Sequence, residues 1–600
     1  MSKERTRSRQ ASGAKPWAWV PSLYFAEGIP YVLVMILSVI FYKRMGISNA
    51  QIALYTSWLY LPWVIKPLWS PVVDILRTKR FWILIMQLCI GAGLAGVALT
   101  IPAGRFFQYT LAFFWLLAFS SATHDIAADG FYMLGLSKHD QAFFVGIRST
   151  FYRIAMLTGQ GLLVILAGAF EARTGLPPVE TNVQVLEGAQ SMVFDPEAAR
   201  LSAEAEAQQS SGRYFISPGE LKIGLKKIPV AEAKRLLAAT EAWNTAHGFY
   251  ADADSAAKGD GDLCGNVGYT WFRLSEAPEE GESIVLNYSM DKGDKSISLH
   301  RSYRYEFTAE NWNQPAFAVF QLDPKLERET MSSFKGLSGN IRFAWSMVFL
   351  IVAVLFAGFH IYHRFSLPRP VADKPRANEG GFWQEFFETF ASFFRKKRIG
   401  VILLFLLVYR LGESQLVKLA SPFLLDAREA NGLGLTTGDL GLIYGTVGII
   451  ALSIGGIVGG IAASRKGLKY WLWWMVAAMN LPNLVYVFLS YAMPSSLWIV
   501  GASVALEQFG YGFGFTAYML YMIYVSEGKH KTAHFALTTG FMALGMMIPG
   551  MISGWLQELI GYQHFFIWVM ICTIPGFVLI PFLRIDPAFG KKVKDSDRQE

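Results

Sequence analysis

Long apolar stretches recur along most of the 600-residue chain and set the pattern of its predicted elements. A helix needs about 20 predominantly apolar residues to cross the hydrocarbon core of a membrane. Twelve windows of that kind occur, each with boundaries soft by several residues. They are 18–42, 51–73, 81–102, 107–134, 143–170, 341–363, 399–424, 438–463, 470–493, 496–525, 533–557 and 562–583. The pattern predicts an all-α polytopic membrane protein with twelve membrane-spanning helices.

A polar segment from residue 173 to residue 340 separates the fifth window from the sixth. Within it, "ESIVLNYSM" and "AFAVFQLD" alternate apolar and polar residues, which is typical of strands. The stretch "VAEAKRLLAATEAW" has the spacing of a helix. The sequence therefore predicts a small β-rich domain inserted between helices 5 and 6.

A second polar stretch joins the first six windows to the last six. Its first part, 364–381, is rich in Pro and Gly, and its second part, 382–398, carries phenylalanines at helical spacing and a basic end. Such a stripe is typical of a helix lying at the membrane surface. The predicted organisation is an amino-terminal half with helices 1–5 (1–172), the insertion (173–340), helix 6 (341–363), the linker with its amphipathic helix (364–398), and a carboxyl-terminal half with helices 7–12 and a tail (399–600).

The composition agrees with a membrane location for most of the chain. Charged residues make up 17%, whereas soluble proteins average about 25%. The formal net charge of +8 divides into −8 for residues 171–340 and +16 for the remainder. Lysine and arginine concentrate in alternate links between the windows, so the positive-inside rule predicts that both termini are cytoplasmic and that the insertion is outside. This distribution argues against a nucleic-acid partner.

Several ionisable residues interrupt the apolar windows. A charge near the middle of a bilayer costs several kcal/mol, so such residues normally face a cavity or a partner. They are therefore our candidates for proton coupling and for contact with a transported solute. The candidates are Glu27 in span one, His124, Asp125 and Asp129 in span four, Arg153 in span five, Arg410, Glu413 and Lys418 in span seven, and Glu507 in span ten.

Asp125 and Asp129 are four residues apart, so they lie on one face of a helix, and His124 points about 100° away from Asp125. Two ionised carboxylates on one face repel each other. Either a cation such as Arg153 neutralises them in a fixed structural pair, or one of them keeps a proton. The second alternative gives a site that loads and releases protons, as a symporter requires.

The cations in the other spans also leave alternatives open. Arg410 and Glu413 are one helical turn apart and either pair along their own helix or face a solute. Lys418 has no well-aligned carboxylate on its helix, which favours a substrate anion or Glu507 as its partner. We expect Lys66, close to the inner end of span two, to extend its ammonium toward the membrane surface. Arg148 is interpreted as a positive-inside residue.

Seven stretches, in this order along the chain, resemble one family of membrane proteins. They are "YFAEGIPYVL", "KPLWSPVVD", "FSSATHDIAADGF", "FYRIAMLTGQG", "VYRLGESQ", "LEQFGYGFGFTAY" and "HFALTTGFMALG". Together they resemble the AmpG-type muropeptide permeases of the major facilitator superfamily, with acetyl-CoA transporters as a related branch. The resemblance covers most of the twelve windows and none of residues 173–340.

The resemblance implies a major facilitator fold and proton-driven import of N-acetylglucosaminyl-anhydro-N-acetylmuramic acid, with or without peptide, across a bacterial inner membrane. Asp125 and Asp129 fall on the family's acidic pair. Asp74 falls on the acidic end of the span-two motif, where the family implies a gate formed with loop cations such as Arg77 and Arg80. His124 stands where the family usually shows Gln, so another sugar, a glycopeptide or an acetyl-CoA-like solute stays open.

The sequence favours a transporter over an enzyme. It shows no metal-ligand spacing and no activated Ser or Cys arrangement, so we expect no catalytic residue, metal or cofactor. The alternative is a membrane-embedded enzyme in which His124 and Asp125 act as a base pair on a lipid-linked sugar. The expected partners are a glycopeptide or amino-sugar solute, protons and the lipid bilayer. Residues 173–340 either contact cell-wall fragments or a periplasmic partner, or are an inert insertion.

Overall fold

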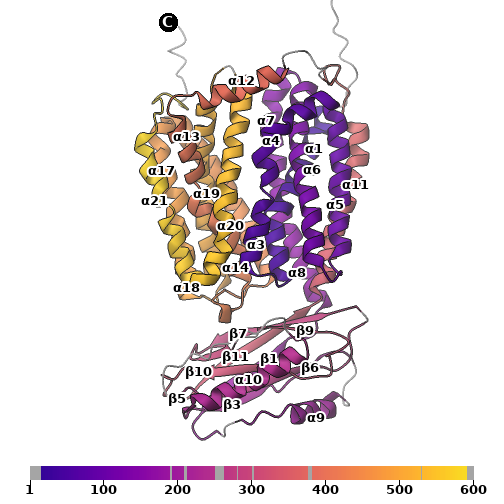
Figure 1. Cartoon of the computed structure of the whole chain (residues 1–600), viewed down its shortest axis with the longest axis vertical. Helices are drawn as coiled ribbons and strands as arrows, with labels where there is room; N and C mark the ends of the chain where they lie inside the picture. Colours follow the sequence, from indigo (N-terminus) through magenta and orange to yellow (C-terminus); the bar gives the residue numbers. More distant parts are fainter. Residues whose placement is uncertain are drawn as a thin grey trace, which may run out of the picture. The chain divides into compact units, whose positions relative to one another are not determined.

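The computed structural model describes residues 15–189, 192–207, 212–249, 263–279, 281–300, 303–375, 382–528 and 530–590. The chain divides into two compact units, drawn together in Figure 1. The helical unit contains residues up to Ile165, Ser346–Pro422 and the chain from Thr437 onward. The second unit contains Leu166–Trp345 and Phe423–Thr436 and carries the β-sheets.

Long apolar helices, several of which are interrupted by short turns of wider π-helix, build the helical unit. Residues 166–174, 341–345 and 423–425, at the ends of three of these helices, belong to the second unit. The elements before the sheets are α1 (Val20–Val32), η2 (Leu33–Leu37), α2 (Ser38–Arg44), α3 (Asn49–Trp58), α4 (Leu61–Leu76), α5 (Lys79–Thr100), α6 (Phe106–Gly135), α7 (Lys138–Leu157), η3 (Thr158–Leu162) and α8 (Leu163–Thr174). The elements after them are α11 (Ile341–Ser366), α12 (Phe382–Phe394), α13 (Ile399–Val408), α14 (Leu411–Leu425), α15 (Thr437–Leu440), η5 (Gly441–Val447), α16 (Gly448–Lys466), α17 (Leu468–Asn480), α18 (Leu484–Ala492), α19 (Leu497–Ser526), α20 (Lys531–Ile571) and α21 (Ile574–Leu579).

Nine helices in the described part of the chain are long and apolar enough to cross a membrane, where the sequence pattern predicts twelve. The predicted span 51–73 is not among the nine, and it is broken between α3 and α4. The predicted span 496–525 corresponds to α19, whose apolar run is diluted by polar residues and glycines. The last two predicted spans form one run, Ala533–Phe582, that changes direction at Gly561, where φ is 74°. The twelve-span arrangement stays a prediction.

The three π-helical turns η2, η3 and η5 meet inside the helical unit, because η3 packs against both of the others. At the contact between η3 and η5, a Cβ added to Gly445 would lie 1.9 Å from the carbonyl oxygen of Gln160. The two backbones therefore touch directly, which is possible only without a side chain at this position. Turns of π-helix are rare in proteins, and those that occur are often found at functional sites.

Helix α12 lies across one end of the helical unit (Figure 1). Its Thr389 and Ser392 hydroxyls lie 3.2 Å and 2.9 Å from ring nitrogens of His530 and His534, respectively. Phe393 is buried, whereas Phe387 and Phe394 are exposed. The helix is thus held to the beginning of α20 through one face and presents aromatic side chains on another.

The second unit contains two main β-sheets that share one apolar core. A five-stranded sheet has the order β3-β1-β11-β7-β9, and a four-stranded sheet has the order β2-β6-β10-β8. The strands are β1 (Val179–Leu186), β2 (Phe215–Ile216), β3 (Glu220–Gly224), β6 (Val267–Leu274), β7 (Ile284–Gly293), β8 (Ile297–His300), β9 (Arg304–Phe307), β10 (Ala316–Leu322) and β11 (Thr330–Gly339); β4 (Ile228–Pro229) and β5 (Leu263–Cys264) form a separate pair, and two helices, α9 (Pro196–Ala207) and α10 (Val230–Ala246), complete the unit. Strands of both main sheets contribute to the core, including Val183, Leu286, Phe320 and Phe334.

The stretches "ESIVLNYSM" and "AFAVFQLD" coincide with β7 and β10, and the predicted helix coincides with α10. The location of these sheets outside the membrane stays a prediction. The unit also includes residues 423–436, whose turn η4 (Arg428–Ala430) packs against β7 and β8. The predicted boundary at 173–340 did not anticipate that a loop far away in the sequence would join the sheets.

The two ends of the inserted segment lie side by side. The backbone N–H of Leu176 donates to the hydroxyl of Ser338 over 2.8 Å, and the N–H of Asn340 donates to the hydroxyl of Thr174 over 3.0 Å. The chain therefore leaves α8 and returns to α11 at nearly the same point.

Candidate functional site

Three acidic side chains converge in the helical unit. Glu27 extends from α1, and Asp125 and Asp129 extend from α6. One carboxylate oxygen from each lies within 4.8 Å of the others. The two aspartates share a face of α6 because they are one helical turn apart. We call these three residues the carboxylate cluster.

Each aspartate of the carboxylate cluster has its own cation. Lys66 of α4 forms an ion pair with Asp125, and Arg148 of α7 forms an ion pair with Asp129 at 2.9 Å. The hydroxyl of Tyr24 also donates to Asp129 over 3.1 Å. The Arg148 guanidinium lies over the ring of Tyr24, 4.5 Å from its centroid, which fixes the cation between two helices.

Glu27 has no such partner. Its side chain is only 7% exposed, and its Oε2 atom has no hydrogen-bond partner among the described residues. The side chains of Asp125 and Asp129 are 21% and 41% exposed, so the cluster is not sealed. Three carboxylates thus face two cations, and full ionisation leaves one negative charge in excess.

The structure therefore keeps both of the alternatives considered for the aspartates. The neutralising cations are Lys66 and Arg148 and not Arg153, which makes no ion pair within the described chain. Arg148 and Arg153 are five residues apart and point in directions about 140° apart, so one α7 face cannot present both to α6. The expectation that Lys66 extends toward the membrane surface is wrong, because its ammonium is used by Asp125. The sequence feature that could have indicated a buried partner for Lys66 is its position between two prolines inside an apolar window.

His124 points away from the carboxylate cluster, as its position next to Asp125 predicts. It is fully buried, and its Nε2 lies 3.1 Å from the side-chain nitrogen of Gln87. That nitrogen lies 2.8 Å from His363 of α11, whose other ring nitrogen contacts Ser22 at 2.9 Å. Because the imidazole and the Asp125 carboxylate diverge, they do not form the base pair that the enzyme alternative requires.

A second group of buried charges lies on α14 and α19 and in the turn between α13 and α14. Arg410 donates to the hydroxyl of Tyr511 over 2.7 Å, and its guanidinium lies over the rings of Tyr511 and Phe515. Both carboxylate oxygens of Glu413 are buried without a hydrogen-bond partner in the described residues. Of the two alternatives for Arg410 and Glu413, the described chain shows no ion pair between them. The backbone N–H of Ser414 donates to the carbonyl oxygen of Arg410, so the two side chains lie on one helical turn, but the guanidinium is directed to Tyr511.

Lys418 is 1% exposed and reaches from α14 to α3. Its ammonium donates to the hydroxyl of Thr56 over 2.9 Å and lies 5.1 Å from the centroid of the Tyr60 ring. No ion pair between Lys418 and a carboxylate occurs in the part of the chain that the structure describes. Glu507, one of its two expected partners, instead accepts a hydrogen bond from Gln508 at 2.9 Å.

Tight contacts also join α3, the helix that carries Thr56, to α20. The side-chain nitrogen of Asn49 donates to Gln557 over 2.6 Å and to the hydroxyl of Tyr562 over 2.8 Å. A Cβ added to Gly554 would lie 2.0 Å from the carbonyl oxygen of Asn49. Together with the contact between η3 and η5, this joint holds the first group of helices against the last group.

The three residues of the predicted gate are only partly described. The side chain of Asp74 lies outside the described residues, so its pairing stays a prediction. The Arg80 guanidinium donates to the carbonyl oxygens of Arg364 and Leu367, and Arg77 lies over the ring of Phe81 at 5.7 Å. The carboxylate of Asp373 accepts the backbone N–H groups of Lys79 and Arg80, which start α5.

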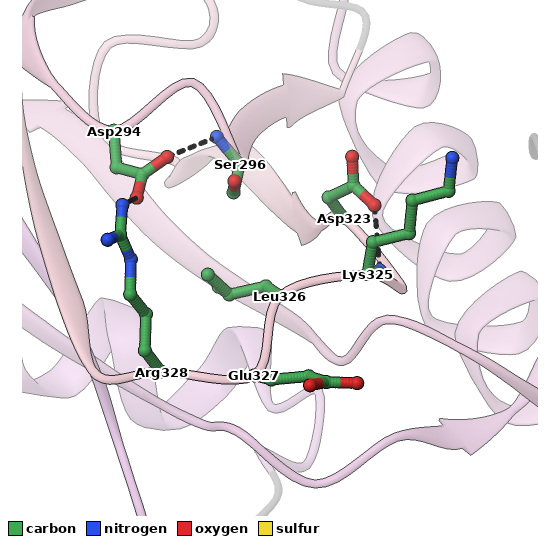
Figure 2. A pocket seen from close by; sticks show the side chains of 7 residues that line it. All are labelled: Asp294, Ser296, Asp323, Lys325, Leu326, Glu327 and Arg328. Atoms are coloured by element: carbon green, nitrogen blue, oxygen red, sulfur yellow. Dashed lines mark hydrogen bonds and ion pairs between the residues drawn. The ribbon is translucent and has the colours of Figure 1, made fainter.

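A small pocket of about 370 Å³ lies in the sheet-containing unit (Figure 2). Asp294 accepts the backbone N–H of Ser296 over 2.9 Å and pairs with Arg328 at 3.5 Å, and these contacts hold the pKa of its carboxyl below the usual value. Asp323 accepts the backbone N–H of Lys325 over 2.8 Å. Both aspartates are thus used to shape the loops that form the pocket wall.

Residues 27–207 match the model of the BT1 family. The chain is 28% identical over 240 residues to the putative transporter AmpG 2 of Rickettsia typhi, and the matched region covers 40% of this chain and 56% of that protein. It is 27% identical over 192 residues to the anhydromuropeptide permease of Escherichia coli K12, covering 32% and 38% of the two chains. This chain is similar to AmpG-type permeases. The resemblance expected from the motifs is confirmed.

The chain spans about half the length of the curated relatives that it matches, or less. The match to the family model includes all three members of the carboxylate cluster and both of their cations. A solved structure described as the nucleoside transporter NupG has a TM-score of 0.51 at 11% identity and covers 94% of this chain and 98% of its own. This second likeness is one of fold alone.

Proposed function

We propose that the chain is a secondary active transporter that uses a proton gradient to import muropeptides. In this proposal it spans a bacterial inner membrane twelve times as two six-helix halves. Both termini are cytoplasmic, and the sheet-containing unit is periplasmic. The similarity to the anhydromuropeptide permease supports N-acetylglucosaminyl-anhydro-N-acetylmuramic acid, with or without peptide, as the solute. Another sugar, a glycopeptide or an acetyl-CoA-like solute is the alternative.

The carboxylate cluster is the observation that carries the proton coupling. Its three acids face two cations, so the region is electrically neutral only when one proton is bound. An uncompensated charge in a buried site is costly, which makes the uptake of that proton favourable. A proton that moves inward gains about 2.3 kcal/mol for each 100 mV of membrane potential. This energy drives accumulation if proton binding and solute binding are linked.

The contacts between helices support alternating access. In the proposed orientation, the α3–α20 joint and the η3–η5 contact lie toward the periplasm and close that side. The two aspartates of the cluster lie nearer the end of α6 that is cytoplasmic in this orientation, and they are partly exposed. We infer an inward-facing arrangement, in which opening the other side requires both contacts to separate.

The decisive experiment is transport by purified protein in proteoliposomes. Anhydro-muropeptides, free amino sugars and acetyl-CoA are offered with and without an imposed proton gradient. We expect accumulation of the unchanged anhydro-muropeptide only with the gradient. Accumulation that ignores the gradient contradicts proton coupling, and preference for another solute contradicts the substrate. Chemical conversion of the muropeptide in detergent supports the enzyme alternative.

Lys418 and Arg410 are the proposed contacts for the solute's anionic groups. Muropeptides carry carboxylates, and Lys418 is a buried ammonium without a carboxylate partner among the described residues. When α3 separates from α20, the Lys418 ammonium loses Thr56 and faces the opening. A charged hydrogen bond contributes about 1.5–3 kcal/mol, which supports a role in capture.

Replacing Lys418 by Met is therefore expected to raise the KM for a carboxylate-bearing muropeptide by about 10- to 100-fold, the effect of losing one charged hydrogen bond. Lys418→Arg keeps the charge and is expected to keep part of the affinity. Lys466→Met, which removes a cation stacked on Tyr470, is the matched control. Equal effects of Lys418→Met on solutes with and without a carboxylate would contradict the assignment.

Deleting residues 177–338 is expected to leave a folded transporter with a similar maximal rate. The ends of the segment lie within hydrogen-bond distance, so a short Gly/Ser bridge replaces it without moving α8 or α11. Uptake kinetics in proteoliposomes measure the effect. A higher KM at an unchanged maximal rate would assign capture of cell-wall fragments to the insertion, and loss of folded protein would contradict the expectation.

A further inference from the structure

We propose that Glu27 is the residue that binds and releases the coupling proton, while Asp125 and Asp129 stay ionised in their ion pairs. The inference rests on the proposed function, because it concerns the proton of that transport cycle. It differs from the sequence-based interpretation, which placed the exchangeable proton on one of the two aspartates.

The contacts of the carboxylate cluster distinguish the three acids. Asp125 pairs with Lys66, and Asp129 pairs with Arg148 and accepts a hydrogen bond from Tyr24. A cation in direct contact favours the ionised form of a carboxyl group, and a hydrogen bond to the carboxylate has the same effect. The structure therefore already contains, at both aspartates, local contacts that favour a carboxylate over a carboxylic acid.

Glu27 is in the opposite situation. It is more than nine-tenths buried, one of its oxygens has no hydrogen-bond partner in the described chain, and it faces two other carboxylates within 4.8 Å. A buried carboxylate without a partner is costly in its ionised form. Binding a proton removes the excess charge and turns the unpartnered oxygen into a donor directed at acceptors in the cluster.

The groups that face Glu27 come from four helices. Lys66 extends from α4, Asp125 and Asp129 from α6, and Arg148 and Tyr152 from α7, and Tyr24 lies on α1 one turn before Glu27. With every carboxyl ionised, the charges of these groups and Glu27 together sum to −1. With one proton on Glu27, they sum to zero.

Glu27 is also the acid whose backbone is best placed to move. Pro30 interrupts the hydrogen bonding of α1 three residues later, and the helix continues as the π-turn η2. An internal proline removes one helix hydrogen bond and bends the helix. In each cycle a proton from periplasmic water forms an O–H bond on Glu27, and this bond breaks when the proton passes to cytoplasmic water. A change of charge on α1 thus acts at the point where α1 bends most easily.

The test compares accumulation with exchange in proteoliposomes. Glu27→Gln imitates the protonated acid, so it is expected to abolish both accumulation driven by a proton gradient and solute-driven proton uptake. Exchange of labelled for unlabelled solute needs no net proton movement, and it is expected to slow by no more than about tenfold, the effect of one ordinary hydrogen bond. Glu27→Asp keeps an acid and is expected to keep pH-dependent accumulation. Glu527→Gln, on an exposed loop, is the control.

Three outcomes would overturn the inference. Glu27→Gln that still accumulates solute shows that another group carries the proton. Folded Glu27→Gln that loses exchange as completely as accumulation shows a structural role. Because Asp125→Asn alone also changes the charge balance, the proton is assigned to Asp125 only if Lys66→Met with Asp125→Asn, which restores the excess carboxylate, keeps exchange but still loses accumulation. If the wild-type protein accumulates solute without a proton gradient, that result contradicts the proposed function itself and not only the assignment of the proton to Glu27.

Discussion

Replacing Asp125 by Asn is expected to lower proton-driven accumulation by at least about 100-fold, because it removes the excess carboxylate charge, which costs roughly 3–5 kcal/mol when buried and uncompensated and so makes proton binding favourable. The ammonium of Lys66 loses its carboxylate and turns to the remaining acids of the cluster. Two carboxylates, Glu27 and Asp129, then balance two cations, and the site is neutral without a proton. The variant is therefore expected to remain in the membrane as folded protein but to bind no coupling proton.

The double variant Lys66→Met with Asp125→Asn provides the sharpest control. It removes one positive and one negative charge, so the excess of one carboxylate is restored and part of the proton-dependent uptake is expected to return. Asp195→Asn, at the start of α9 in the sheet-containing unit, is the neutral comparison, because Asn also accepts the backbone N–H of Ala198. If the double variant is no better than the single one, charge balance does not explain the cluster.

Replacing Gly445 by Leu is expected to drive the protein toward the arrangement in which the η3–η5 contact is open. A side chain at this position collides with the carbonyl oxygen of Gln160, and such overpacking costs about 1–3 kcal/mol. A cost of about 1.4 kcal/mol changes the ratio of two conformations tenfold. Uptake is expected to fall by at least that factor, because the closed arrangement becomes rare.

The opening is measured by labelling a cysteine at position 56 with a membrane-impermeant maleimide, in protein lacking Cys89, Cys264 and Cys572. Thr56 is fully buried beneath the α3–α20 joint, so its labelling reports separation of the halves. Gly460→Leu in the same predicted span is the matched control, since no described atom lies within 4 Å of a Cβ there. Faster labelling in Gly445→Leu alone supports opening of the protein at the η3–η5 contact. Equal labelling in both variants contradicts it.

The sequence located the charged residues of the site but not their partners. The spacing of Asp125 and Asp129 predicts a shared face, and the step of 100° per residue separates His124 from it. Both expectations depend only on local helix geometry. The choice of Arg148 over Arg153 depends on the rotation of α7 against α6, and the pairing of Lys66 depends on α4 packing beside α6. Those relations are set by tertiary packing and are not encoded in the spacing of one helix.

The same distinction applies to Arg410 and to the difference between the twelve predicted spans and the nine long apolar helices of the described chain. The sequence pattern leaves two partners open for Arg410, namely Glu413 on its own helix or a solute. The structure directs the guanidinium to Tyr511 of α19, a contact between helices that the spacing within one helix does not show. The apolar windows predict the lengths of the helices well. A short break, or a change of direction such as that at Gly561, changes the composition too little to be detected from hydropathy.

The inserted segment can be exchanged for another folded domain at this position, because its two ends are joined by the contacts of Thr174 with Asn340 and of Leu176 with Ser338. Any autonomously folding module whose own termini are adjacent fits there without stretching the flanking chain. A fluorescent protein inserted at this point would show on which side of the membrane the segment emerges.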